Sequence, residues 1–143
     1  MRTFSETVPL ELHANGRFDV PVADRWWDEP EHFPFFIRDG ERLNGFALVK
    51  RGSRVTAGAA DVMDVAEFFV IRGARAKGVG AAAAHALFTA FPGPWEIRVR
   101  QTNVLAKRFW ARAAQTWAGR PVASEPFSAD GVAWDLFRLG DRP

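Results

Sequence analysis

The stretch from residue 64 to residue 91 constrains the fold of this 143-residue chain more than any other. It begins with a run of β-branched and aromatic residues ending at Ile71, which predicts a strand. Alanines follow from Ala81, so we expect a helix from Gly80 to about Phe91. The glycines at 78 and 80 let backbone N–H groups approach a ligand at the positive end of this helix. The order strand, glycine turn, helix therefore predicts a phosphate cradle, which a bulky side chain at Gly80 would block.

Positive charge is concentrated around this turn. Residues 71–112 carry eight basic side chains against the single acidic Glu96, although the formal net charge of the whole chain is only +2. Such an excess suits a polyanionic ligand, either a nucleotide cofactor or a nucleic acid. A solvated basic surface has the same composition, so charge alone leaves the choice open.

Length and composition predict a single domain over residues 1–143. The chain has no cysteine, which excludes disulfides, thiolate metal sites and a cysteine nucleophile. No run approaches the roughly 20 apolar residues of a membrane span, and the first residues lack the apolar core of a signal peptide. We therefore expect a cytoplasmic protein without a membrane partner. The three histidines have no partners at metal-ligand spacing, so no metal site is expected.

Further elements surround the glycine turn. Before it, the pattern predicts a short helix (Ala23–Glu29), a hairpin (Phe33–Arg38 with Gly45–Lys50) and a long strand (about Val62–Ile71). After it come a strand (Trp95–Arg100), a helix capped by Thr102 or Asn103, and a second hairpin (Pro121–Phe127 with Val132–Leu139). Together they predict a mixed α/β sheet with one core.

Two motifs on successive strand and helix pairs resemble those of a known family. Arg75-x-x-Gly78-x-Gly80 follows Phe68-Phe69-Val70, and Asn103-x-x-Ala106-x-x-Phe109-Trp110 follows the next strand. They look like the pyrophosphate signature and the second motif of the GNAT superfamily of acyl-CoA-dependent N-acetyltransferases. Gly45-Phe46-Ala47 resembles the family's strand that enters the core. The resemblance covers about residues 17–143. It implies an α/β (α+β), mostly antiparallel twisted sheet of about six or seven strands, flanked by helices, with the cofactor cleft where the central strands splay apart.

The resemblance also implies how acetyl-CoA would bind as co-substrate. Backbone groups of Phe68 and Val70 would pair with the pantetheine arm, and amides from Ala76 to Gly80 would hold the pyrophosphate. Arg75 would line the approach and Asn103 would contact the arm from the opposite side. Lys107, Arg108 or Arg72 could meet the 3′-phosphate. The implied cofactor-binding residues are Phe68, Phe69, Val70, Arg75, Ala76, Lys77, Gly78, Val79, Gly80, Asn103, Ala106 and Phe109.

The implied reaction is direct attack of an amine on the acetyl thioester, which requires a base to remove the ammonium proton. Asp64 and Glu67 are the candidates, and Glu67 is preferred because it lies nearer the thioester. They are three positions apart, so only a bulge would let both reach one cavity. Many family members use a tyrosine as general acid where this chain has Trp110, and this chain has no tyrosine. A thiol with a pKa near 8.5 can leave without a donor, so water could serve.

Several alternatives stay open. The alternative to an N-acetyltransferase is a non-catalytic acyl-CoA-binding module with the same fold, for which the missing tyrosine is the main support. A dinucleotide fingerprint is disfavoured because Gly78 lies seven residues after Ile71, and a nucleic-acid partner because aromatic and basic residues do not alternate. The acceptor is an amine of a small molecule or a protein. The amino-terminal strand is either absent or compressed into residues 1–12. If it is absent, a second subunit could cover the sheet edge, giving a homodimer.

Overall fold

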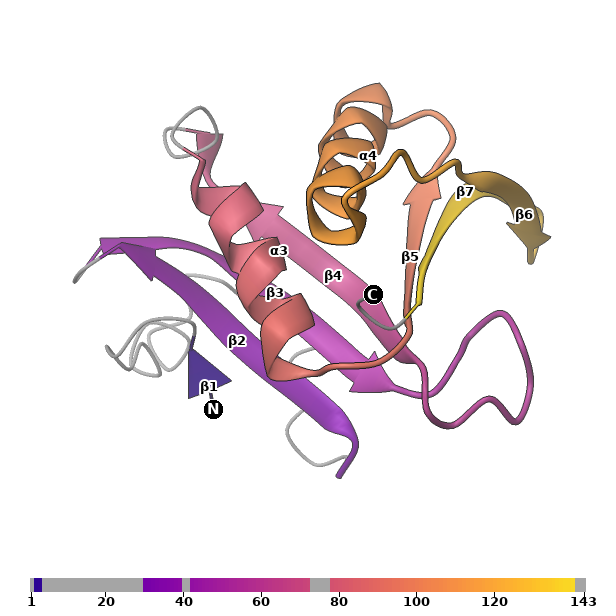
Figure 1. Ribbon diagram of the computed structural model, residues 1–143, viewed down its shortest axis with the longest axis horizontal. Coiled ribbons are helices and arrows are strands. Elements are labelled where there is room, and N and C mark those ends of the chain that lie inside the picture. The colour runs from indigo at the N-terminus through magenta and orange to yellow at the C-terminus, as the bar shows by residue number, and fades with distance from the viewer. Residues whose placement is uncertain (1, 4–29, 40–41, 73–77, 141–143) are drawn as a thin grey trace.

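The computed structural model describes residues 2–3, 30–39, 42–72 and 78–140. These residues form a seven-stranded sheet with the strand order β1-β2-β3-β4-β5-β7-β6 (Figure 1). Neighbouring strands run antiparallel, except that β1 is parallel to β2 and β4 is parallel to β5. The mixed, mostly antiparallel sheet of six or seven strands is therefore confirmed.

The elements appear in the predicted order, with ends that differ by a few residues. They are β1 (Arg2–Thr3), β2 (His32–Asp39), β3 (Arg42–Arg51), β4 (Met63–Val70), α3 (Val79–Ala90), β5 (Trp95–Arg100), α4 (Val104–Ala118), β6 (Glu125–Ala129) and β7 (Val132–Leu139). The helix predicted at Ala23–Glu29 lies outside the described residues. Of the two alternatives for the first strand, the structure has a short one, because Arg2–Thr3 pairs with Phe35–Phe36 of β2.

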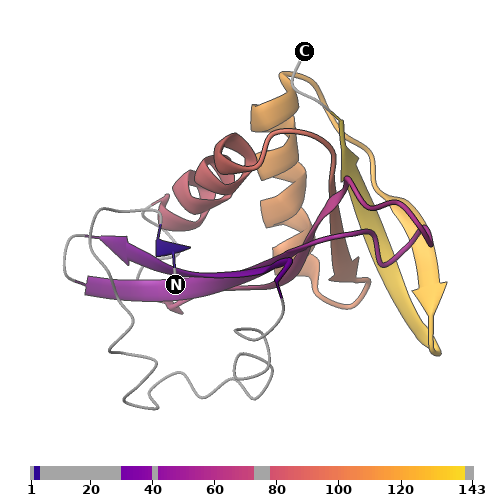
Figure 2. The same cartoon turned by 90° about the horizontal axis from the view of Figure 1, so that it is seen from below.

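Both described helices lie over the same face of the sheet, inside the angle between its two halves (Figure 2). The main core forms between this face and the helices, from side chains such as Val65, Ile97, Leu87 and Trp110. Neither helix is long and apolar enough to cross a membrane, among the residues that the structure describes.

A bulge in β4 changes which of its side chains share a face. Leu48 of β3 lies opposite Glu67, whereas the next residue, Val49, lies opposite Val65. Ala66 is therefore an extra residue on β4. Val65 and Phe68 both pack against the helix-side core, so the side chains of Asp64 and Glu67 both point to the other face. The sequence analysis required a bulge for both carboxylates to reach one cavity, and β4 contains this bulge.

Gly45 allows β3 and β4 to approach each other beside this bulge. It lies opposite Val70, and a Cβ added to it would overlap the backbone carbonyl oxygen of Phe69. The backbone N–H of Ile71 then donates to the Asn44 carbonyl oxygen at 2.7 Å. The glycine in the motif Gly45-Phe46-Ala47 thus fixes the position of the end of β4.

Candidate acyl-CoA cleft

The two central strands separate after a short paired region. Met63–Val65 of β4 pairs with Trp95–Ile97 of β5, and beyond this β4 follows β3 while β5 follows β7. The strands diverge visibly from this point (Figure 1). In the part of the chain that the structure describes, no strand borders β4 on this side from Ala66 to Val70. The polar backbone groups of that edge are left to other partners.

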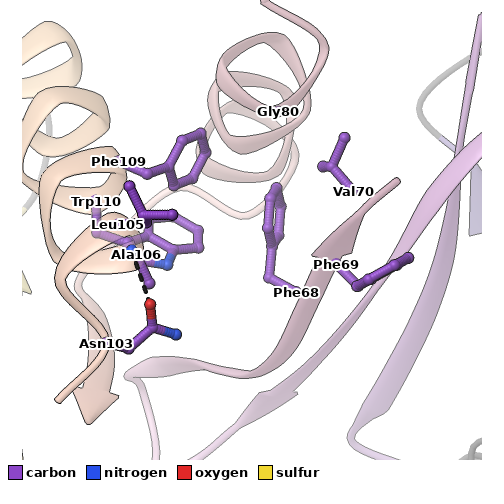
Figure 3. Close-up of a pocket in the computed structure, with 9 residues that line it drawn as sticks. All are labelled: Phe68, Phe69, Val70, Gly80, Asn103, Leu105, Ala106, Phe109 and Trp110. Atoms are coloured by element: carbon purple, nitrogen blue, oxygen red, sulfur yellow. Dashed lines mark hydrogen bonds between the residues drawn. The ribbon is translucent and has the colours of Figure 1, made fainter. Parts of the chain in front are cut away.

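A cavity of about 560 Å³ opens between this edge of β4 and the helices. Figure 3 shows Phe68 pointing into it from β4, opposite side chains of the first turns of α4. The residues that line it are Phe68, Phe69, Val70, Gly80, Asn103, Leu105, Ala106, Phe109 and Trp110. Seven of the predicted cofactor-binding residues are thus brought together, although their roles stay predictions.

Phe68, Phe109 and Trp110 form an aromatic wall of the cavity. The Phe68 ring centroid is 5.5 Å from that of Phe109 and 4.9 Å from that of Trp110, and the latter two are also 4.9 Å apart. Phe69 differs, because its side chain points away from the cleft and stacks on Phe46 at 5.7 Å (Figure 3). Alternation along β4 explains this difference.

The glycine turn leads into α3 at the wide end of the cleft. Gly78 is the N-cap residue and has a φ of 75°, a left-handed conformation that favours glycine. Val79 begins the helix, and the first turn carries no acidic residue. Gly80 is buried against Phe109, since an added Cβ would lie 3.0 Å from the Phe109 Cε1 atom. Gly80 therefore allows close packing of the helix as well as any approach of a ligand. Arg75, Ala76 and Lys77 lie outside the described residues.

Asn103 begins α4 as the predicted cap. Its Oδ1 atom accepts a hydrogen bond from the Ala106 backbone N–H at 3.1 Å, drawn as the dashed line in Figure 3. Its Nδ2 group is the remaining donor of the side chain. Lys107, in the next turn, forms an ion pair of 2.8 Å with Asp135 of β7, which joins α4 to the sheet. Lys107 is one of the three basic residues considered for the 3′-phosphate, and in this structure its ammonium group is paired with Asp135 instead.

The two carboxylates on the far face have different surroundings. Asp64 is fully buried, with Oδ1 at 3.6 Å from the Arg98 Nε atom and Oδ2 at 3.7 Å from the Arg54 Nε atom. Burial raises the pKa of Asp64 above its ordinary value, and the two guanidinium groups oppose this only in part. Glu67, by contrast, is exposed. Of the two, only Glu67 is accessible to a proton-bearing group from solvent.

Sequence reasoning did not assign two of the residues that line the cavity. Trp110 was expected in the apolar stripe of α4 and as a departure from the family, and Leu105 was not singled out. Leu105 is 73% exposed at the mouth of the cavity. Leu105 lies two residues after the helix cap and carries no periodic signal, whereas the position of Trp110 in the second motif could have indicated it. Among the described residues, no group of histidine, aspartate and glutamate could hold a metal ion.

The comparisons with known proteins agree with this geometry. The sequence model of the Acetyltransferase (GNAT) family matches residues 3–114. A search of curated proteins finds no match. Several solved structures share the fold, although their sequences are only distantly similar.

Three of these structures are informative. The ribosomal-protein-S18-alanine N-acetyltransferase of Escherichia coli has 12% identity and a TM-score of 0.65, covering 97% of this chain and 93% of its own. A GNAT-family protein of Desulfovibrio desulfuricans has 15% identity and a TM-score of 0.61, covering 95% and 84%. A Bacillus anthracis protein of the streptothricin acetyltransferase type, solved with acetyl coenzyme A, has 13% identity and a TM-score of 0.55, covering 82% and 66%.

The non-catalytic alternative is not favoured. The chain belongs to the GNAT acetyltransferase family, and it is an N-acetyltransferase.

Proposed function

We propose that the cleft between β4 and α4 binds acetyl-CoA and that Glu67 removes the proton from the acceptor amine. The observation that supports this most is the edge of β4 from Ala66 to Val70, which borders a cavity and has no neighbouring strand among the described residues. An extended ligand with amide groups can add to such an edge as another strand would. The pantetheine arm has this chemistry, so backbone groups of Phe68 and Val70 would pair with it.

The pyrophosphate would lie at the amino-terminal end of α3. The first backbone N–H groups of a helix have no partner within the helix, and its dipole favours an anion there. The absence of acidic side chains from the first turn of α3 suits this role. Gly78, Val79 and Gly80 would supply amides. Arg75, Ala76 and Lys77 stay predictions of the sequence motif.

Burial favours Glu67 over Asp64 as the base. A base must reach the ammonium proton directly or through one water molecule. Asp64 is fully buried between Arg54 and Arg98, whereas Glu67 is exposed one residue after the bulge. Asp64 would instead hold these two arginines in place. Arg98 in turn stacks over Trp134 of β7, with its Cζ atom 5.1 Å from the ring centroid.

The acceptor is an amine of a small molecule or a protein. The structural neighbours include enzymes named for both kinds of acceptor, since one is named for ribosomal protein S18 and another for streptothricin. At 12% and 13% identity neither acceptor transfers to this chain. Its action as one domain, its cytoplasmic location and its assembly as a monomer or homodimer stay predictions.

Calorimetric titration with acetyl-CoA and an assay of turnover over a panel of amines and peptides test this proposal. Glu67→Gln should bind acetyl-CoA as the wild type does, and its kcat should fall by about 100-fold or more. Asp61→Asn, which removes one exposed carboxylate from the loop before β4, serves as the control and should keep both properties. No binding at millimolar acetyl-CoA would refute the cleft, whereas normal turnover by Glu67→Gln would refute only the base.

A further inference from the structure

Arg98 of β5 is a largely buried arginine whose charge is only partly compensated. Its side chain is 13% exposed, and its buried Nε atom has no hydrogen-bond partner, since the Oδ1 atom of its ion-pair partner Asp64 lies 3.6 Å away. Asp64 also faces Arg54, with its Oδ2 atom 3.7 Å from the Arg54 Nε atom. Burial raises the pKa of Asp64, which further reduces the negative charge that the two arginines share. The Arg98 guanidinium can therefore bind a further anion.

A second arginine lies beside Arg98 at the same aromatic ring. Arg100 of β5 is exposed. The Cζ atoms of Arg98 and Arg100 lie 5.1 and 5.5 Å from the ring centroid of Trp134 on β7. A guanidinium group within about 6 Å of an aromatic ring is attracted to it, so Trp134 holds both groups in place. Two positive charges are thus gathered at one ring, which favours an anionic ligand there.

This pair of arginines shares a sheet face with the proposed base. Glu96 lies opposite Asp64, so Arg98, two residues later on β5, points to the same face as Asp64. The bulge places Glu67 on this face too, which is the face turned away from the helices (Figure 2). Arg98 and Glu67 both follow the last residue pair between β4 and β5. The base and the arginines therefore stand on the two strands that separate to open the cleft.

The rest of the acceptor should lie between these two strands. Phe68 and the first turns of α4 border the cleft on the helix side. An amine that meets Glu67 therefore approaches from the other face, past the unpaired edge of β4. The part of the acceptor that extends from the amine towards β5 then meets Arg98 and Arg100.

We propose that the acceptor is a small molecule whose amine lies within a few bonds of an anionic group, a carboxylate or a phosphate, and that Arg98 and Arg100 bind this group. The inference rests on the acetyl-CoA cleft and the base proposed above. The planar fork of a guanidinium group matches both anions and binds them by charge-assisted hydrogen bonds. The amino terminus of a protein carries a neutral amide at this distance from its nitrogen, so it lacks the group that the arginines would bind.

Matched pairs of amines test the acceptor class on the wild-type protein. One pair is an amino acid and its amide, a second is 2-aminoethyl phosphate and ethanolamine, and an amidated peptide with a free amino terminus is added. The anionic member of at least one pair should have a kcat/KM about tenfold or more above that of its neutral partner. The amine of an amino acid amide is the less basic of its pair, so a preference for the acid would not come from easier deprotonation. The pair with the larger ratio identifies carboxylate or phosphate as the group bound.

The outcomes separate this inference from the proposed function. Equal or faster turnover of the neutral amines or the peptide would overturn the inference and leave the cleft intact. Turnover of no anionic amine by a protein that binds acetyl-CoA would also overturn it. A protein that does not bind acetyl-CoA would refute the proposed function, and this inference with it.

Substitutions of the arginines test their part in selectivity. Arg98→Met should lower kcat/KM for the anionic acceptor about 100-fold, while the neutral partner and the Kd for acetyl-CoA stay within about threefold. Arg98→Lys keeps the charge without the fork, so it should restore part of this loss. Arg120→Gln, which removes an exposed cation just after α4, at the other end of that helix from Asn103, is the control and should change none of these values.

The result for both members of a pair decides the role of the arginines. Equal losses for the anionic and the neutral amine in Arg98→Met would mean a structural role and would refute the proposed contact. If Arg98→Met does not fold, Arg100→Gln, at an exposed position, gives the decision. It should lower the preference for the anionic amine about tenfold, and an unchanged preference would overturn the inference.

Discussion

Replacing Gly80 with alanine should weaken acetyl-CoA binding by moving one aromatic ring. The new Cβ atom would lie 3.0 Å from the Phe109 Cε1 atom and 3.3 Å from its Cζ atom, and 3.5 Å from the Val70 Cγ2 atom. Carbon atoms pack best at about 3.5–4.0 Å, so the Phe109 ring must move by roughly 0.5 Å. The space it can enter is the cleft, where Phe68 already stacks on it at 5.5 Å.

The magnitude follows from two opposing terms. Overpacking costs about 1–3 kcal/mol, and alanine in place of glycine within a helix returns about 1 kcal/mol. The net loss in the free energy of unfolding should therefore be about 0–2 kcal/mol, which leaves the variant folded. The displaced ring occupies part of the space for the arm, and we expect the Kd for acetyl-CoA to rise about tenfold, or about 1.4 kcal/mol.

Urea unfolding and calorimetric titration measure the two effects separately. Gly131→Ala is the matched control, because Gly131 has a φ of 77° and no atom within 4 Å of an added Cβ, far from the cleft in the turn between β6 and β7. It should lose about 1–2 kcal/mol of stability through backbone strain without any change in affinity. The reasoning is refuted if Gly80→Ala weakens binding no more than Gly131→Ala does. Gly80→Trp is less informative, since it would separate α3 from α4 and could abolish binding through unfolding.

Two further substitutions test the packing and the electrostatics of β4. Gly45→Ala should cost about 3 kcal/mol or more in urea unfolding, because its Cβ would overlap the backbone carbonyl of Phe69, which cannot move aside as a side chain could. Gly140→Ala, with no atom within 4 Å of the added Cβ, should change stability by less than about 0.5 kcal/mol, and equal losses would refute the steric argument. Asp64→Asn tests the raised pKa of Asp64. The folded wild type keeps the proton of the Asp64 carboxyl at pH values where the unfolded chain has lost it. The stability of the wild type relative to the variant should therefore fall as pH rises from 3.8 towards neutrality. A relative stability that rises with pH would mean that Arg54 and Arg98 outweigh burial.

The sequence predicted the elements well because each has a strong local signal. The alternation in Trp95–Arg100 gave the bounds of β5, and Asn103 is the cap that begins α4. The turn at Asp130-Gly131 has two positive φ angles, as its residue types favour. These features depend on residues that are close in the chain.

The remaining features depend on contacts between distant residues. The register shift that makes Ala66 an extra residue requires the pairing of β4 with β3, which no local pattern in β4 records. The contact of Gly80 with Phe109 joins α3 to α4, and therefore only the assembled fold shows it. Trp110 looked like an ordinary core residue for the same reason, because the apolar stripe of α4 predicts its burial but not its place on the cavity wall opposite β4.

The bulge in β4 brings Asp64 and Glu67 onto one face of the sheet, but the surroundings of the two carboxylates differ. Position on a face does not by itself distinguish the two carboxylates as bases. Their positions relative to the point of strand separation differ, however. Asp64 lies where β4 still pairs with β5, opposite Glu96, and is enclosed there by arginines. Glu67 lies two residues beyond the last pair, where β4 has lost that neighbour, so it is exposed. The separation of the strands that opens the cleft thus also distinguishes the carboxylate that supports the fold from the one that can accept a proton.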